Sequence, residues 1–174
     1  MKGAGMATVT LEGRALELVG EPLKAGDAAP DFEALGMDLT PVRLADFRGK
    51  AVLISAVPSL DTSVCSLETR KLNEFAARMS DQAVFLTISM DLPFAQARWC
   101  KQETVDAMKV ASDHVSAEFG SRYGVLIKPL RLLARCVFVV GPDGKIAYRE
   151  LVKEISDEPD YDAAIQALRK VATK

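Results

Sequence analysis

A nearly continuous apolar run covers residues 50–57, without the alternation of a strand that has one wet face. Such a run is typical of a strand that is covered on both faces in a central sheet. Residues 82–90 repeat the pattern, and a shorter apolar segment spans residues 108–111. These runs predict the buried middle of the fold.

Between and after these runs, apolar residues recur at helical spacing. A helix is predicted from residue 63 onward, with Thr62 or Ser63 as its N-cap and one apolar face. That face carries Val64, Leu67, Leu72, Phe75, Ala76 and Met79. The solvent side is expected to carry Glu68, Arg70, Lys71 and Glu74. Further helices are predicted over residues 93–102, which begin with a proline, over residues 114–123 and over residues 161–171.

Two hairpins complete the predicted elements. Residues 8–11 and 14–19 flank the dipeptide Glu12-Gly13, and residues 135–140 and 145–152 flank a turn of sequence Gly-Pro-Asp-Gly. Strands that alternate with helices, followed by a hairpin and a closing helix, predict an α/β fold with a mixed sheet covered on both faces. Residues 1–174 show no repeat or linker, so they are expected to form a single domain.

Composition narrows the possible partners and locations. The chain has 174 residues, of which 49% are hydrophobic and 26% charged, and its formal net charge is -2. No excess of positive charge would attract nucleic acid or an anionic membrane. The N-terminus lacks the apolar core of a secretory signal, and the apolar runs are too short to span a membrane. A cytoplasmic protein is therefore expected.

The cysteines are the candidate chemistry. There are three, Cys65, Cys100 and Cys136, which is too few for a disulfide scaffold. Cysteines inside cells are usually reduced unless their redox chemistry is used. Cys65 lies in the first turn of the helix predicted from residue 63, where the macrodipole favours a thiolate. The alternative is that Cys65 is a small buried helix residue and that Thr62 is merely its cap.

The other candidate residues have structural explanations. Cys136 follows Arg135 on a predicted strand, so the two side chains should point to opposite faces, and Cys136 is expected to be buried and structural. His114 lies near a predicted helix start at Ser112 and Asp113, where a cap-adjacent or surface position is expected. One histidine and no Cys-x-x-Cys pair leave no zinc site.

Two motifs carry a resemblance to a known family. The pattern Pro58-x-x-x-Thr62-x-x-Cys65 after an apolar strand, with Gly-Asp-x-Ala-Pro-Asp-Phe upstream at residues 26–32, resembles the peroxiredoxins. Residues 91–100, with the sequence Asp-Leu-Pro-Phe-Ala-Gln-Ala-Arg-Trp-Cys, and the sequence Glu-Pro-Asp-Tyr at residues 158–161 look like the bacterial thiol peroxidase subgroup of that family. The resemblance covers about the whole chain.

The resemblance implies a thioredoxin-like fold and the reduction of hydroperoxides. It makes Cys65 the peroxidatic cysteine, which becomes a sulfenic acid, and Cys100 the resolving cysteine of the same chain. Thr62 would orient the peroxide through its hydroxyl, Pro58 would shield the pocket from water, and Arg135 would supply fixed positive charge. Without the family, Arg135 would be interpreted as a surface ion-pair partner.

The family also suggests partners. It implies thioredoxin as the reductant and a homodimer formed near Arg98 and Trp99. The expected substrates are hydrogen peroxide and organic (alkyl and lipid) hydroperoxides; the resemblance leans to the bulkier ones, and which is preferred stays open. No metal or organic cofactor is required by this chemistry.

Geometry adds a constraint to the disulfide. Both cysteines are expected on helices, and a disulfide needs Cα atoms within about 7 Å of each other. The first turn with Cys65, the end of the helix with Cys100, or both must therefore unwind during turnover.

Two other functions could use a reactive Cys65. A thiol–disulfide oxidoreductase normally needs Cys-x-x-Cys, and the position three before Cys65 is Thr62. A redox-sensing or binding module, in which oxidation of Cys65 changes a protein surface, stays open.

Overall fold

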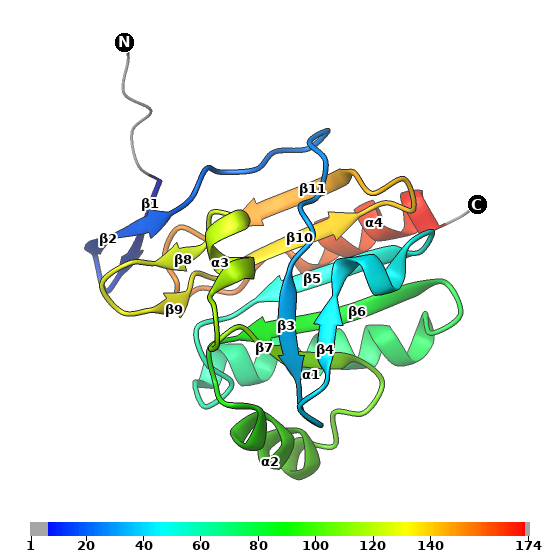
Figure 1. The fold of residues 1–174 in the computed structure, drawn as a ribbon, viewed down its shortest axis with the longest axis horizontal. Coiled ribbons are helices and arrows are strands. Elements are labelled where there is room, and N and C mark those ends of the chain that lie inside the picture. The colour runs from blue at the N-terminus through cyan, green and yellow to red at the C-terminus, as the bar shows by residue number, and fades with distance from the viewer. Residues whose placement is uncertain (1–6, 173–174) are drawn as a thin grey trace.

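The apolar runs of the sequence form the middle of a seven-stranded sheet in the computed structural model, which describes residues 7–172 (Figure 1). The strands of this sheet are β3 (Glu33–Gly36), β4 (Pro41–Arg43), β5 (Ala51–Ala56), β6 (Ala83–Ser89), β7 (Lys109–Ser112), β10 (Cys136–Val140) and β11 (Ile146–Leu151). Their order is β11-β10-β5-β6-β7-β3-β4, and β5, β6 and β7 run parallel. The predicted central strands and the hairpin of β10 and β11 are confirmed.

The two faces of this sheet are covered by different elements. The helices are α1 (Ser63–Arg78), α2 (Pro93–Glu103), α3 (Glu118–Arg122) and α4 (Tyr161–Ala172), and a short 3-10 helix η1 spans Leu44–Phe47. On β5, Leu53 belongs to an apolar cluster with α1, α2 and α4, whereas Ile54 belongs to a second cluster with α3. Successive residues of a strand point to opposite faces, so the predicted mixed sheet with both faces covered is confirmed. None of the helices in the described part of the chain is long and apolar enough to cross a bilayer.

The N-terminal hairpin belongs to a second, smaller sheet. It consists of β1 (Thr8–Leu11) and β2 (Arg14–Val19), the ranges that the sequence predicted, and β2 pairs with β8 (Leu126–Ile127), which pairs with β9 (Leu132–Leu133). The same hairpin touches a distant segment, because Thr10 forms an isolated bridge with Glu154. This contact links the start of the chain to the loop between β11 and α4.

The helix predicted over residues 114–123 is wrong in its start. The helix begins at Glu118, and residues 114–116 form a turn before it. The carboxylate of Asp113 accepts hydrogen bonds from the backbone N–H groups of Phe119 and Gly120, at 3.1 and 2.8 Å. Because Asp113 satisfies these first-turn donors from six and seven residues upstream, the chain must turn before the helix starts. His114 lies in this turn, and its Nδ1 is 2.8 Å from the hydroxyl of Ser112.

Four strands have no counterpart in the sequence analysis. They are β3, β4, β8 and β9, which have two to four residues each. None of these segments stands out in the sequence as a distinct apolar run or as an alternating pair around a turn, so pairing with neighbouring strands decides their conformation.

Candidate active site

Cys65 lies at the start of α1, the helix that follows β5. After β5 the backbone N–H of Val57 still donates to Ile88 at 3.0 Å, and Pro58, which is buried, begins the loop to the helix. Cys65 is the third residue of α1 and has no exposed surface. Thr62 has the extended backbone of an N-cap residue but makes no side-chain cap hydrogen bond. The N–H groups of the first turn are thus without a side-chain cap, and they surround the thiol with positive partial charge.

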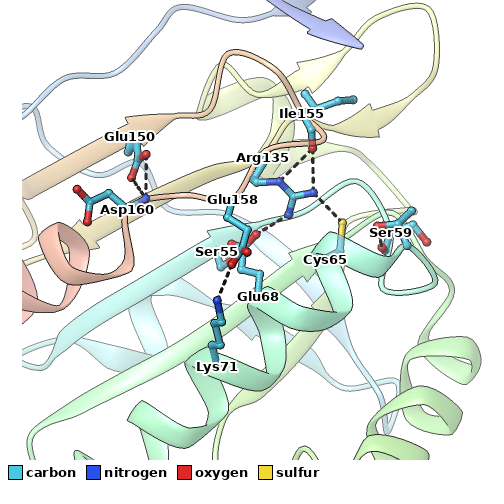
Figure 2. A network of polar contacts seen from close by, with 11 residues as sticks. Ser55, Ser59, Cys65, Glu68, Lys71, Arg135, Glu150, Ile155, Glu158 and Asp160 are labelled. Carbon is cyan, nitrogen blue, oxygen red and sulfur yellow. Dashed lines mark hydrogen bonds and ion pairs between the residues drawn. The ribbon is translucent and has the colours of Figure 1, made fainter. Parts of the chain in front are cut away.

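Arg135 reaches this sulfur from the neighbouring strand. It immediately precedes β10, whose Cys136 pairs with Ala56 at the end of β5, so Arg135 lies beside the loop that leads to α1. Its Nη2 donates to the Sγ of Cys65 at 3.3 Å (Figure 2). Only 1% of Arg135 is exposed, which makes the alternative of a surface ion-pair partner wrong. A fixed positive charge beside the sulfur stabilises a thiolate.

Three further contacts hold the guanidinium of Arg135 in place. Nη1 contacts the carboxylate of Glu68 at 2.5 Å, and Nε and Nη2 both donate to the carbonyl of Ile155, at 3.1 and 2.9 Å (Figure 2). Burial by itself lowers the pKa of Arg135, but the charges of Glu68 and Cys65 outweigh burial, and the net pKa is raised. Arg135 therefore keeps its charge although it is buried.

The prediction that Glu68 lies on the solvent side of the helix is wrong. Glu68 is fully buried, between the hydroxyl of Ser55 at 2.6 Å and Arg135. Burial raises the pKa of Glu68, while Arg135 and Ser55 oppose this effect. The sequence held a signal for this position, because counting from Cys65 places Glu68 three residues on, one helical turn away on the same face.

The hydroxyl of Thr62 hydrogen-bonds within the loop that precedes Cys65. Thr62 is exposed, and its Oγ1 donates to the carbonyl of Ser59 at 2.9 Å rather than to the sulfur. Ser59 in turn donates to Asp91 at 2.7 Å, and the backbone N–H of Leu60 donates to the same carboxylate at 2.8 Å. Asp91 lies just before α2, so it ties the loop before Cys65 to the start of the helix that carries Cys100.

A cleft of about 370 Å³ opens between the start of α1 and α2. It is lined by Leu60, Asp61, Thr62, Ser63, Ser66, Arg98, Trp99, Gln102 and Glu103. Thr62 thus lines a cleft, whereas Cys65 is not among the residues that line it and has no exposed surface. Because the sulfur has no exposed surface, the structure around Cys65 must shift before a peroxide can reach it.

The remaining cysteines lie in apolar surroundings. Cys100 is in the last turn of α2, in the same apolar cluster as Cys65, and burial raises the pKa of its thiol to about 11. Cys136 is in the cluster on the opposite face of the sheet, as predicted, and burial raises its pKa also. All three thiols are free, and the predicted disulfide partners occupy two separate helices.

Comparisons with known proteins show the family to which the chain belongs. The family model described as Redoxin matches residues 24–165. The chain is 52% identical over 165 residues to the thiol peroxidase of Listeria innocua, which covers 95% of this chain and 99% of that protein. It is 48% identical over 164 residues to the thiol peroxidase of Bacillus subtilis, over 94% of this chain and 98% of that one.

A solved structure leads to the same family. The peroxiredoxin-like protein from Aquifex aeolicus matches with a TM-score of 0.89 and 41% identity, over 95% of this chain and 98% of that chain. The thiol peroxidase from Chromobacterium violaceum shares the fold, with a TM-score of 0.82. The thioredoxin-like fold is therefore confirmed, and the chain belongs to the redoxin family and, within it, to the thiol peroxidases of the peroxiredoxins.

Proposed function

We propose that Cys65 is the sulfur that attacks the hydroperoxide in the thiol-dependent peroxide reduction of this family. The observation that carries the proposal is the contact between Arg135 Nη2 and Cys65 Sγ at 3.3 Å, made by a guanidinium that Glu68 and Ile155 also hold. A thiolate at this place needs no metal or organic cofactor to react with a peroxide.

In the first step the thiolate attacks one peroxide oxygen in line with the O–O bond. A sulfur–oxygen bond forms, the O–O bond breaks, and its electron pair leaves with the second oxygen, which takes up a proton to become water or an alcohol. Cys65 becomes a sulfenic acid. Negative charge moves from the sulfur to the departing oxygen, and Arg135 and the first-turn N–H groups of α1 are donors that can stabilise it along that path.

The role of Thr62 follows from where its proton lies. Its O–H is already donated to the carbonyl of Ser59. The hydroxyl oxygen still has lone pairs, so Thr62 can accept a hydrogen bond from the O–H of a hydroperoxide. Pro58 has no backbone N–H and is buried beside this loop, so it adds no competing donor and keeps water from the sulfur.

Cys100 resolves the sulfenic acid in the second step. Its sulfur attacks Cys65, a disulfide forms, and the sulfenic oxygen leaves as water. Both cysteines are buried on helices, so the end of α2, the first turn of α1 or both must unwind. A disulfide that closes about 35 residues stabilises the chain by roughly 3 to 4 kcal/mol, which offsets the loss of one or two helical turns.

Two serine variants and disulfide mapping test these assignments. With one equivalent of peroxide, the unmodified protein is expected to form a Cys65–Cys100 disulfide, identified by mass spectrometry without reduction. Cys65→Ser should consume no peroxide above the uncatalysed rate. Cys100→Ser should consume about one equivalent and stop at the sulfenic acid.

Other outcomes would contradict the proposal. A disulfide between Cys100 and Cys136, or undiminished peroxide consumption by Cys65→Ser, would assign the reaction to a different sulfur. If the unmodified protein forms the disulfide but shows no turnover with any dithiol reductant, the protein is a redox sensor rather than a peroxidase.

The proposal extends to partners and location. Thioredoxin is the proposed reductant, alkyl and lipid hydroperoxides are the proposed substrates alongside hydrogen peroxide, and the cytoplasm is the proposed location, since free cysteines persist there. We also propose a homodimer through the surface around Arg98, where Leu92 and Phe94 of the same segment are 54% and 69% exposed. Light scattering with Phe94→Asp, which should yield monomers, tests the dimer.

A further inference from the structure

Arg135 also contacts the backbone carbonyl of Ile155, a residue that lies outside the motifs quoted above. This carbonyl accepts two hydrogen bonds from one guanidinium, from Nε at 3.1 Å and from Nη2 at 2.9 Å. The same Nη2 donates to Cys65. Two bonds to a single acceptor fix the plane of the guanidinium, so the position of the Ile155 carbonyl sets the direction in which Arg135 points its donor at the sulfur.

Ile155 lies in the loop between β11 and α4, and the N-terminal hairpin holds this loop. The backbone N–H of Thr10 donates to Lys153 at 2.7 Å, and the N–H of Ile155 donates to the carbonyl of Thr10 at 2.9 Å. Both backbone groups of Thr10 are thus bonded to the loop. These two hydrogen bonds form an isolated parallel bridge between Thr10 and Glu154.

The side chain of Glu154 closes the same junction. Its Oε2 accepts from the hydroxyl of Thr10 at 2.9 Å and from the N–H of Gly13 at 3.3 Å, and its Oε1 accepts from the N–H of Glu12 at 3.2 Å and from Ser156 Oγ at 2.8 Å. The hydrogen bond from Ser156 contributes most to lowering the pKa of Glu154, to about 2, and those from Thr10 and the hairpin turn add to it. The carboxylate therefore stays charged at neutral pH.

The turn of the hairpin presents two backbone N–H groups to Glu154. Glu12 and Gly13 both have positive φ, 50° and 78°, as a tight hairpin turn of two residues requires. Glu12 is not a glycine, so it adopts this conformation at a cost. The N–H groups of both turn residues donate to Glu154, which offsets that cost.

We propose that the N-terminal hairpin is a positioning element for the reaction: Thr10 and Glu154 hold the carbonyl of Ile155, which orients Arg135 toward Cys65. This inference rests on the role proposed above for Arg135. Thr10 and Glu154 touch neither the sulfur nor the peroxide and act through Arg135.

Variants at the junction test the proposal in the full-length chain. They are Thr10→Val, Glu154→Gln and the double variant Thr10→Val/Glu154→Ala. The matched control is Glu17→Gln, which removes a carboxylate of the same hairpin whose contact is with exposed Lys128 at 3.9 Å. One readout is the single-turnover rate constant of Cys65 oxidation by hydrogen peroxide, and the other is the pH midpoint of Cys65 alkylation by iodoacetamide in a Cys100→Ser background.

The double variant is expected to lower the rate constant about tenfold, since small misplacements of a catalytic group have effects of this size or larger. The pH midpoint of alkylation should move up, because a misaligned Arg135 stabilises the thiolate less. The single variants should show smaller changes in the same direction, and Glu17→Gln none. A contact that merely fastens the hairpin would lower the thermal midpoint and leave the alkylation midpoint unchanged.

Two failures can be told apart by including Arg135→Lys. If the double variant keeps both the wild-type rate constant and the wild-type alkylation midpoint while Arg135→Lys is slow, the positioning role is wrong and the proposed role of Arg135 stands. If Arg135→Lys is also as fast as the wild-type protein, the proposed function of Arg135 is wrong, and the inference fails with it.

Discussion

Cys65 and Cys100 are buried in the same apolar cluster, yet their surroundings differ in charge. Cys65 accepts a hydrogen bond from a guanidinium, and it lies in the first turn of a helix. Cys100 lies in the last turn of a helix, where the macrodipole is negative, and burial raises the pKa of its thiol to about 11. Burial alone therefore does not distinguish the two thiols. The difference between them is the positive charge of Arg135, which lies beside Cys65.

The difference implies an order of events. Cys65 lies beside the positive charge of Arg135 while the chain is folded, so we expect it to react with peroxide first. In the proposed mechanism, Cys100 acts as a nucleophile after its helix opens, because contact with water lowers its pKa toward the ordinary value. Because no positive charge offsets its burial, Cys100 is expected to keep its proton and to stay unreactive until Cys65 has reacted.

The largest effect on the difference between the two cysteines is expected when the positive charge beside Cys65 is removed. Arg135→Met is expected to slow oxidation of Cys65 by about 10²- to 10³-fold, the usual effect of losing a donor that stabilises transition-state charge. It should also destabilise the fold by about 3 to 5 kcal/mol, because Glu68 is left buried without its partner. Single-turnover kinetics and urea unfolding measure the two effects.

The double variant Arg135→Met/Glu68→Gln separates those effects. Both charges are gone, so most of the lost stability should return, whereas the rate of Cys65 oxidation should stay low. A double variant that regains the wild-type rate would show that the charge of Arg135 is not what activates Cys65.

A smaller effect is expected from the thiol of Cys100, which should make the free energy of unfolding depend on pH in alkaline solution. Its pKa of about 11 lies above the ordinary value of 9.0, so the folded protein keeps this proton after the unfolded chain has lost it. The contribution is fully present below pH 9.0 and is lost as the pH rises to about 11. Over that window the free energy of unfolding should fall by about 2 to 3 kcal/mol more in the wild-type protein than in Cys100→Ala.

Urea unfolding at several pH values checks this difference. Cys136 titrates in both proteins, so its effect cancels in the comparison. Equal slopes for the wild-type protein and Cys100→Ala would mean that Cys100 titrates normally in the folded state and that its burial does not protect it.

The sequence predicted elements better than contacts. The strands on both sides of Glu12-Gly13 were predicted to the residue, because a hairpin is specified by local alternation and a two-residue turn. The position of Cys65 at a helix start followed equally from the apolar run before it and the helical spacing after it. Arg135 could be singled out only through the family motifs, because its approach to Cys65 depends on how β10 pairs with β5.

The contacts of the active site could not be predicted from the sequence, for reasons that differ from group to group. Glu68 was assigned to solvent because a charged residue on a helix is usually exposed, and its buried partner lies 67 residues away in the sequence. The carbonyl of Ile155 is a backbone group, which every residue carries, so no pattern distinguishes it. The hydroxyl of Thr62 depends on the conformation of the loop of residues 58–62, which the Asp91 carboxylate fixes from outside.

The smallest expected effect is spectroscopic and comes from Trp99, the neighbour of Cys100. Trp99 is 7% exposed and lines the cleft between α1 and α2. Formation of the Cys65–Cys100 disulfide should unwind the end of α2 and bring the indole into water, which shifts its emission to longer wavelength. The control is Cys100→Ser, in which Cys65 is oxidised without a disulfide, so the emission should stay in place. If the emission of the wild-type protein does not change on oxidation, the end of α2 stays folded, and the movement that joins the two cysteines must lie in the first turn of α1.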